Sequence, residues 1–193
     1  YLALFVDWSA SLSPGERGHI LVINPDRKQG RVLMNYVKAL LDTSPMLGRL
    51  VERETSDSIY MKNGVVLEIG TCSYRTLRGY TLLCCICDEL GFWRAEATAV
   101  PDVEVLQAVK PAMATVPASM LIGISSPHSR RGVLWRAWKQ HYGQERNDIL
   151  VVQAESTDLN PTIDKTLIEA AYEEDPIAAS SEWGGAFRRD IES

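Results

Sequence analysis

The sequence lacks several features by which whole classes of protein are recognised. No apolar run approaches the roughly 20 residues that cross a bilayer, so we expect no membrane span. The opening stretch "YLALFVDWSASL" has no basic segment ahead of its apolar residues, which argues against a secretory signal peptide. It begins in mid-pattern without Met, which suggests a chain cut from something longer and starting inside a helix. The 46% hydrophobic and 23% charged residues are ordinary for a globular protein.

Cysteine and histidine are also scarce, with four and three copies in 193 residues. The histidines are scattered, and no Cys/His pairs occur at the spacing of a zinc site. Three cysteines, Cys84, Cys85 and Cys87, fall in one apolar run, where cysteine packs as a small hydrophobe. We therefore predict no disulfide framework, and a reducing cytosol fits this composition.

Basic residues are few at the C-terminal end of the chain. The net charge is −5, and residues 145–193 hold 12 acidic and 4 basic residues, whereas residues 1–144 hold 13 and 16. An acidic chain argues against a dedicated nucleic-acid-binding domain but allows a local basic stripe. The candidates for that stripe, which contact DNA phosphates or form a solvated face, are Arg130, Arg131, Arg136 and Lys139.

Apolar runs alternate with amphipathic segments along the chain. Buried strands are predicted by the runs "HILVIN", "LLCCIC", "LIGI" and "ILVV". Helices are predicted by "PDRKQGRVLMNYVKALLDTSP", "PDVEVLQAVKPAM", "RRGVLWRAWKQHY" and "TIDKTLIEAAYEEDP", with a last short helix after it. Asn63-Gly64 predicts a hairpin between two further strands. This alternation predicts an α/β fold with a mostly parallel central sheet and flanking helices.

Polar residues follow three of the predicted strands, at the edge where α/β sheets bind ligands. They are Asn24 with Asp26, Asp88 with Glu89, and Ser125 with Ser126. Of a carboxylate pair such as Asp88-Glu89, one member can hold magnesium through its waters and the other can polarise an attacking water. The alternative is a pair that caps the following helix or is simply solvated.

The other half of a nucleotide site is missing from the sequence. A phosphate-binding loop has the pattern G-x-x-x-x-G-K-[ST], and no Gly-Lys-Ser/Thr occurs in the chain. Arg75 and Arg78 precede the acids in "RTLRGY" and could reach a phosphate bound to a neighbouring subunit. The alternative for these arginines is an ordinary surface loop.

Taken in order, these segments resemble the ATPase domain of tailed-phage terminase large subunits, the motors that package DNA into the capsid. "VINPDRKQGRVL" is similar to the strand and helix that follow the family's phosphate loop, and "TLRGYTLLCCICDELGFW" to its Arg-Gly element and Walker B strand. "MLIGISSPHSRRGVLWRAW" is similar to its coupling motif. "LNPTIDKTLIEAAYEEDP" and "SEWGGAFRRDIES" are similar to the end of the domain, so the resemblance covers nearly the whole chain.

The resemblance implies a P-loop NTPase fold of the RecA-like type that lacks its phosphate loop in this chain, with ATP and Mg²⁺ as cofactors. By the same resemblance, Asp88 holds magnesium through water and Glu89 is the catalytic carboxylate. Ser125 and Ser126 fall in the motif that couples hydrolysis to movement. Arg78 is the expected arginine finger, acting on a neighbouring subunit.

The resemblance also implies boundaries and partners. Residues 1–176 would be the ATPase domain, truncated at its N-terminus, and residues 177–193 its end and the start of a linker toward a nuclease domain. The phosphate loop would lie just before Tyr1. The implied partners are double-stranded DNA, further copies in a ring, the portal and the small terminase subunit. The implied location is the cytoplasm of the infected bacterium, without membrane association or secretion.

Two other interpretations are compatible with the residues alone. A helicase or another DExx-type ATPase would share the strand and the acid pair, but its longer chain would show a second RecA-like half. A Rossmann-like binding or scaffold module would use the acids structurally and would have no phosphate loop upstream.

Overall fold

The computed structural model describes residues 12–71, 79–93, 101–145 and 148–188 of the chain. Contacts divide the chain into two compact units, which are treated separately below. The first consists of residues 1–89 and 93–124, and the second of residues 90–92 and 125–193. The helix expected at the N-terminus lies outside the described residues. Within the described ranges, no helix is both long and apolar enough to cross a bilayer.

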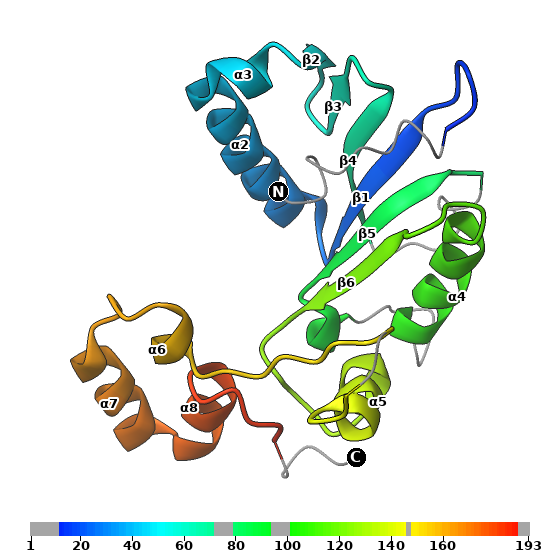
Figure 1. Ribbon diagram of the computed structural model, residues 1–193. Coiled ribbons are helices and arrows are strands. Elements are labelled where there is room, and N and C mark those ends of the chain that lie inside the picture. Colours follow the sequence, from blue (N-terminus) through cyan, green and yellow to red (C-terminus); the bar gives the residue numbers. More distant parts are fainter. Residues whose placement is uncertain (1–11, 72–78, 94–100, 146–147, 189–193) are drawn as a thin grey trace. The chain divides into compact units, whose positions relative to one another are not determined.

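A six-stranded sheet forms the first unit, with the strand order β2-β3-β4-β1-β5-β6 (Figure 1). Its parallel part contains β4 (Val65–Thr71), β1 (Gly18–Asn24), β5 (Leu82–Asp88) and β6 (Met120–Ile124). Two shorter strands, β2 (Val51–Glu54) and β3 (Ser58–Met61), extend it in antiparallel fashion. The predicted α/β class with a mostly parallel sheet is confirmed.

The hairpin predicted at Asn63-Gly64 joins β3 to β4. Gly64 has a φ of +85°, a left-handed conformation that glycine adopts without steric cost. The side chain of Asn63 supports the turn, because its Oδ1 accepts a hydrogen bond from the backbone N–H of Val65 at 3.1 Å. This turn fixes the register in which β3 meets the parallel strands.

Helices α2 (Arg27–Thr43) and α4 (Pro101–Met113) lie on opposite sides of the sheet (Figure 1). Helix α2 begins at Asp26, whose carboxylate accepts hydrogen bonds from the N–H groups of Lys28 and Gln29 at 2.7 and 3.0 Å. Its buried residues include Met34 and Leu41, which belong to the same hydrophobic cluster as the side chains of β1 and β4. A one-turn helix, α3 (Pro45–Gly48), follows it.

Strand β5 is buried on both faces, as its unbroken apolar sequence predicts. It pairs with β1 on one side and β6 on the other. Its cysteines are free, and burial raises the pKa of the Cys84 thiol to about 11. The pKa of the Cys85 thiol is also raised, by its hydrogen bond with Cys87 and by burial. These thiols therefore pack as small hydrophobic side chains, as the sequence indicated.

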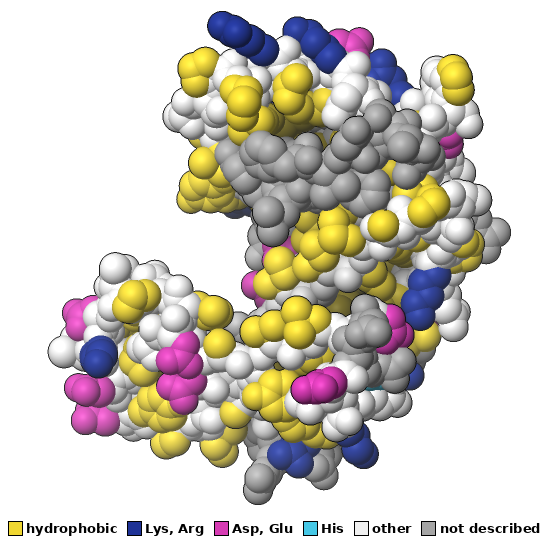
Figure 2. Space-filling view, in the orientation of Figure 1, with side chains coloured by type: hydrophobic (Ala, Val, Ile, Leu, Met, Phe, Trp, Pro, Cys, Tyr) yellow, Lys and Arg dark blue, Asp and Glu magenta, His cyan; other side chains and the backbone are white. Residues whose placement is uncertain are grey.

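Strand β6 is apolar on both faces but lies at an edge of the sheet that the described residues form. The side chains of Leu121, Ile122 and Ile124 are 41%, 36% and 54% exposed. Figure 2 shows hydrophobic side chains at the surface of this part of the unit. Because adjacent residues of a strand point to opposite faces, neither face of β6 is fully covered. Such a composition is typical of a strand inside a sheet rather than at its edge.

The second unit contains the remaining helices. After the single turn η3 (Leu90–Phe92), these are α5 (Gly132–His141), α6 (Ser156–Leu159), α7 (Lys165–Glu174) and α8 (Pro176–Glu182). The predicted helices in this region are confirmed. The rings of Trp135 and Trp138 stack 5.1 Å apart, and Phe187 meets the Trp135 ring at 4.9 Å. These partly buried aromatic rings pack on one another.

One predicted strand is wrong. The segment "ILVV", residues 149–152, forms no strand in the structure, and Leu150 and Val152 are 86% and 73% exposed. The apolar run predicted burial, but a strand also requires a neighbour to which its backbone can donate and from which it can accept hydrogen bonds. No strand of the described part of the chain pairs with this segment.

We expect the variant Gly64→Ala to lower the free energy of unfolding by about 1 kcal/mol, because an L side chain is strained at this positive φ. An added Cβ would meet only ordinary contacts, so strain of the backbone accounts for the whole effect. Urea unfolding measures the change. Gly48→Ala, in α3, is the matched control and should cost nothing; an equal loss in both variants would contradict the role of the turn.

A second prediction concerns Glu68 of β4. His19 Nδ1 lies 3.5 Å from its carboxylate and Tyr80 donates to it at 3.1 Å, and these neighbours hold the pKa of Glu68 below its ordinary value of 4.5. Ionised Glu68 therefore stabilises the fold above pH 4.5, and this contribution disappears as the pH falls through the lowered pKa. We expect Glu68→Gln to destabilise the protein at pH 7 and the difference from the parent to shrink toward pH 3. Thermal unfolding across this range tests it, with the exposed Glu169→Gln as control.

Candidate functional site

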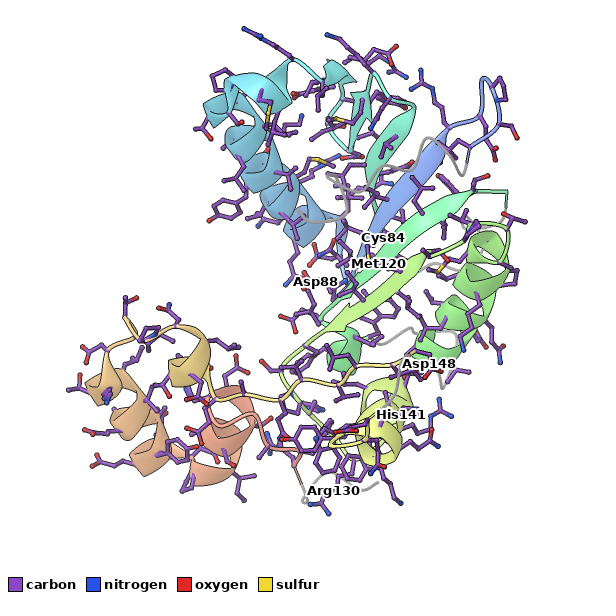
Figure 3. The ribbon with its side chains drawn as sticks, in the orientation of Figure 1. Cys84, Asp88, Met120, Arg130, His141 and Asp148 are labelled. Atoms are coloured by element: carbon purple, nitrogen blue, oxygen red, sulfur yellow. The ribbon has the colours of Figure 1, made fainter. Side chains whose placement is uncertain are left out.

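Asp88 is the last residue of β5, at the C-terminal edge of the parallel strands (Figure 3). Its Oδ2 accepts a hydrogen bond from Asn24 Nδ2 at 2.7 Å. Its backbone carbonyl accepts another from the indole Nε1 of Trp93, also at 2.7 Å. The carboxylate of Asp88 is half-buried, and Asn24, the last residue of β1, is fully buried. Both the strand end and the carboxylate are therefore held in place.

The meeting of Asn24 and Asp88 follows from the register of the two strands. Strands β1 and β5 are parallel, with Val22 opposite Ile86. Side chains alternate between faces, so the residues two positions further along each strand return to the same face. Asn24 and Asp88 occupy those positions, and the parallel register brings their side chains into contact.

Glu89 occupies a turn rather than the strand. Its backbone has φ 53° and ψ 37°, the left-handed conformation that is unfavourable for a residue with a Cβ. It directly precedes η3, but its side chain makes no capping hydrogen bond to that turn. The alternative in which the acid caps the following helix is thus not what the structure shows. The two adjacent acids belong to different local structures.

Ser125 connects the two segments of the second unit, residues 90–92 and residues 125–193. Its Oγ accepts a hydrogen bond from the N–H of Gly91 at 3.1 Å and donates one to the carbonyl of Ser126 at 2.8 Å. A Cβ on Gly91 would lie 3.0 Å from Ser125 Oγ and 3.2 Å from that carbonyl, so the close approach requires glycine. The chain just after the acid pair is therefore tied to the chain just after β6.

The four basic candidates differ in their surroundings. The guanidinium of Arg130 lies 5.4 Å from the centre of the Trp135 ring and is half-buried. Arg131, Arg136 and Lys139 are exposed, the last two on α5 at positions three apart. Residues three apart share one side of a helix, so Arg136 and Lys139 present neighbouring charges. Their contact with DNA stays a prediction.

Arg75 and Arg78 lie outside the described residues, so the proposed arginine finger stays a prediction. Gly79, which follows them, has a φ of +95°. The polar strand ends at Asp88 and Asn24 meet, whereas Asp26 begins α2 as its N-cap.

A magnesium ion held through its waters fits Asp88. The described residues contain no group of three or more His, Cys, Asp or Glu side chains arranged around a common metal position. Mg²⁺ in nucleotide sites needs fewer protein ligands, because one or two carboxylates and the substrate phosphates suffice. Asp88, half-buried and with one oxygen already fixed by Asn24, provides such a carboxylate.

Two partners of the site were not identified from the sequence. The hydrogen bond between Asn24 and Asp88 joins residues 64 positions apart, and the indole of Trp93 holds the Asp88 carbonyl. The signal for the first was available, since Ile20, Val22 and Asn24 alternate in step with Cys84, Ile86 and Asp88. No sequence signal indicated the contact of Trp93, because no spacing specifies where an indole N–H will donate.

Comparison with known proteins gives a likeness in fold. No family model matches the sequence, and no curated protein matches it. The large terminase ATPase domain of Thermus phage P74-26 is matched over 93% of this chain and 80% of that one, with a TM-score of 0.65 and 16% identity. An arginine-to-alanine mutant of that domain is matched over 90% of this chain and 77% of that one, with a TM-score of 0.64 and 16% identity.

The large terminase of bacteriophage HK97 is matched over 89% of this chain and 40% of its own length, with a TM-score of 0.58 and 16% identity. The three structures agree with the architecture described above, a mostly parallel sheet with flanking helices. Over about 90% of its length, this chain has the same fold as phage large terminase ATPase domains.

Proposed function

We propose that this chain is part of a phage terminase large subunit, in which ATP hydrolysis drives double-stranded DNA into the capsid. One observation carries the proposal. An aspartate ends β5, an inner parallel strand, and a glutamate follows it directly, in a chain whose fold is that of a terminase ATPase domain. In parallel sheets this end of the strands is where ligands bind.

The two acids divide the chemistry. Bound Mg²⁺ neutralises charge on the phosphates of ATP. Asp88 holds that ion through its coordinated waters, with its Oδ2 fixed by Asn24. Glu89, placed in the turn beyond the strand, orients and polarises the water that attacks the terminal phosphate. Arg78, from a neighbouring copy in a ring, stabilises the charge that develops on that phosphate.

The phosphates are held by a loop encoded upstream of Tyr1. The edge position of β6 in the sheet of the described residues supports this part of the proposal, since its exposed apolar residues suit a further parallel strand. A strand leading into a G-x-x-x-x-G-K-[ST] loop would cover Leu121, Ile122 and Ile124 and bring the loop to the edge where Asp88 lies.

The remaining assignments concern movement and partners. Ser125 and Ser126 couple hydrolysis to movement, and the hydrogen bond from Gly91 to Ser125 supports a link between the catalytic turn and this motif. DNA phosphates are contacted by the basic side chains on and before α5. The portal and the small terminase subunit are the protein partners, in the cytoplasm of an infected bacterium. Residues 1–176 form the ATPase domain and residues 177–193 lead to a nuclease domain.

Extension of the chain tests the phosphate-loop proposal. Residues 1–193 alone should bind ATP weakly and hydrolyse it negligibly, because the groups that cradle the phosphates are absent from this sequence. A protein that begins roughly 50 residues earlier should bind Mg-ATP and hydrolyse it. Phosphate release and calorimetric titration measure the two quantities. If the extended protein has no phosphate loop and binds no nucleotide, the scaffold interpretation is correct instead.

Substitution of the acid pair tests the catalytic roles in the full-length protein. We expect Glu89→Gln to lower kcat by roughly 100-fold or more while the affinity for ATP stays near that of the parent. Asp88→Asn should instead raise the Mg²⁺ concentration required for activity. Glu104→Gln, on α4, is the control. Turnover that is unchanged by Glu89→Gln would remove Glu89 from the mechanism.

A further inference from the structure

Asn24 differs from every other inward-facing residue of β1. The strand is otherwise apolar, and Ile20 and Val22 precede Asn24 on the same face with exposed fractions of 1% and 2%. Asn24 itself is 0% exposed. A third aliphatic residue would continue the core, so a fully buried amide at this position needs a partner that explains it.

Only one of the two polar groups of the Asn24 amide has a hydrogen-bond partner among the described residues. Its Nδ2 donates to Asp88 Oδ2 at 2.7 Å. Its Oδ1 is buried and has no hydrogen-bond partner among the described residues. Among the described residues, Asp88 is therefore the hydrogen-bond partner of this buried amide.

Helix α2 is built to leave room for this amide. A Cβ on Gly30 would lie 3.0 Å from Asn24 Oδ1 and 3.4 Å from the side chain of Ile69. Gly30 is buried in the first turns of α2, where glycine is a poor helix former. The close approach of the helix therefore packs the backbone of α2 against the Oδ1 end of the amide, while its Nδ2 end contacts Asp88.

We propose that Asn24 is a positioning residue, which orients the Asp88 carboxylate toward a divalent cation bound with nucleotide. This inference rests on the proposed function. The amide donates to Oδ2 of Asp88 and thereby fixes the plane of the carboxylate, whose remaining acceptor positions would face the waters around the cation. Because an amide carries no charge, it fixes the carboxylate without forming an ion pair that would compete with the cation, as lysine or arginine would.

The test uses the full-length protein and Mn²⁺ with a non-hydrolysable ATP analogue, with free Mn²⁺ measured by electron paramagnetic resonance. We expect Asn24→Ala to weaken Mn²⁺ binding by roughly 10-fold or more, the usual effect of removing a group that orients a metal ligand. Asn24→Leu keeps the branched shape of the side chain and removes the unmet acceptor, so it should fold and show the same loss. Asn35→Ala, on the exposed side of α2, should bind Mn²⁺ as the parent does.

Three outcomes separate this inference from the proposed function on which it rests. Weaker Mn²⁺ binding in both Asn24 variants and in Asp88→Asn supports it. Normal Mn²⁺ binding in the Asn24 variants, with or without a lower unfolding temperature, overturns it when Asp88→Asn weakens binding, since Asn24 is then merely structural. Normal binding in Asp88→Asn as well removes the metal site and the proposed role of Asp88 together.

Discussion

The hydrogen-bonded pairing of β5 with two parallel neighbours is the constraint on which the first unit depends. A strand with partners on both sides and helices over both faces can carry only apolar side chains along its length. Polar groups are then permitted only where the strand ends, and parallel strands end at the same edge. The core and the candidate site are thus two results of one arrangement: five of the six apolar or thiol residues of β5 are buried and the sixth is partly buried, whereas the seventh residue, Asp88, lies at the edge.

How far the sequence predicts the fold depends on whether a pattern is local. The helix over residues 27–43 and the hairpin at Asn63-Gly64 were predictable, since spacing and turn chemistry are contained in a few adjacent residues. The structure of residues 149–152 was not predictable, because an apolar run does not specify which other segment packs against it. The apolar run of β6 likewise predicted a strand, but it did not predict that the side chains of this strand would be exposed.

The candidate site was likewise predictable from the sequence only in part. The acids at the end of β5 were found from sequence, since composition marks where the strand stops. The amide that orients one of them depends on strand register and on the approach of α2, and both are properties of the assembled sheet. Asn24 was identified as a polar strand end, but its contact with Asp88 required the alternation of both strands to be followed in parallel.

The left-handed backbone at Glu89 has a consequence for how such a protein can change over evolution. Glycine or asparagine would relieve the strain at φ 53°, whereas only a carboxylate could serve as the general base that we propose at this position. Stability and chemistry therefore select different residues at one position. If a lineage no longer needed the chemistry, the backbone would favour drift toward glycine here first. A glycine directly after this aspartate in a protein of the same fold would then mark a copy that has kept its architecture and lost its catalytic role.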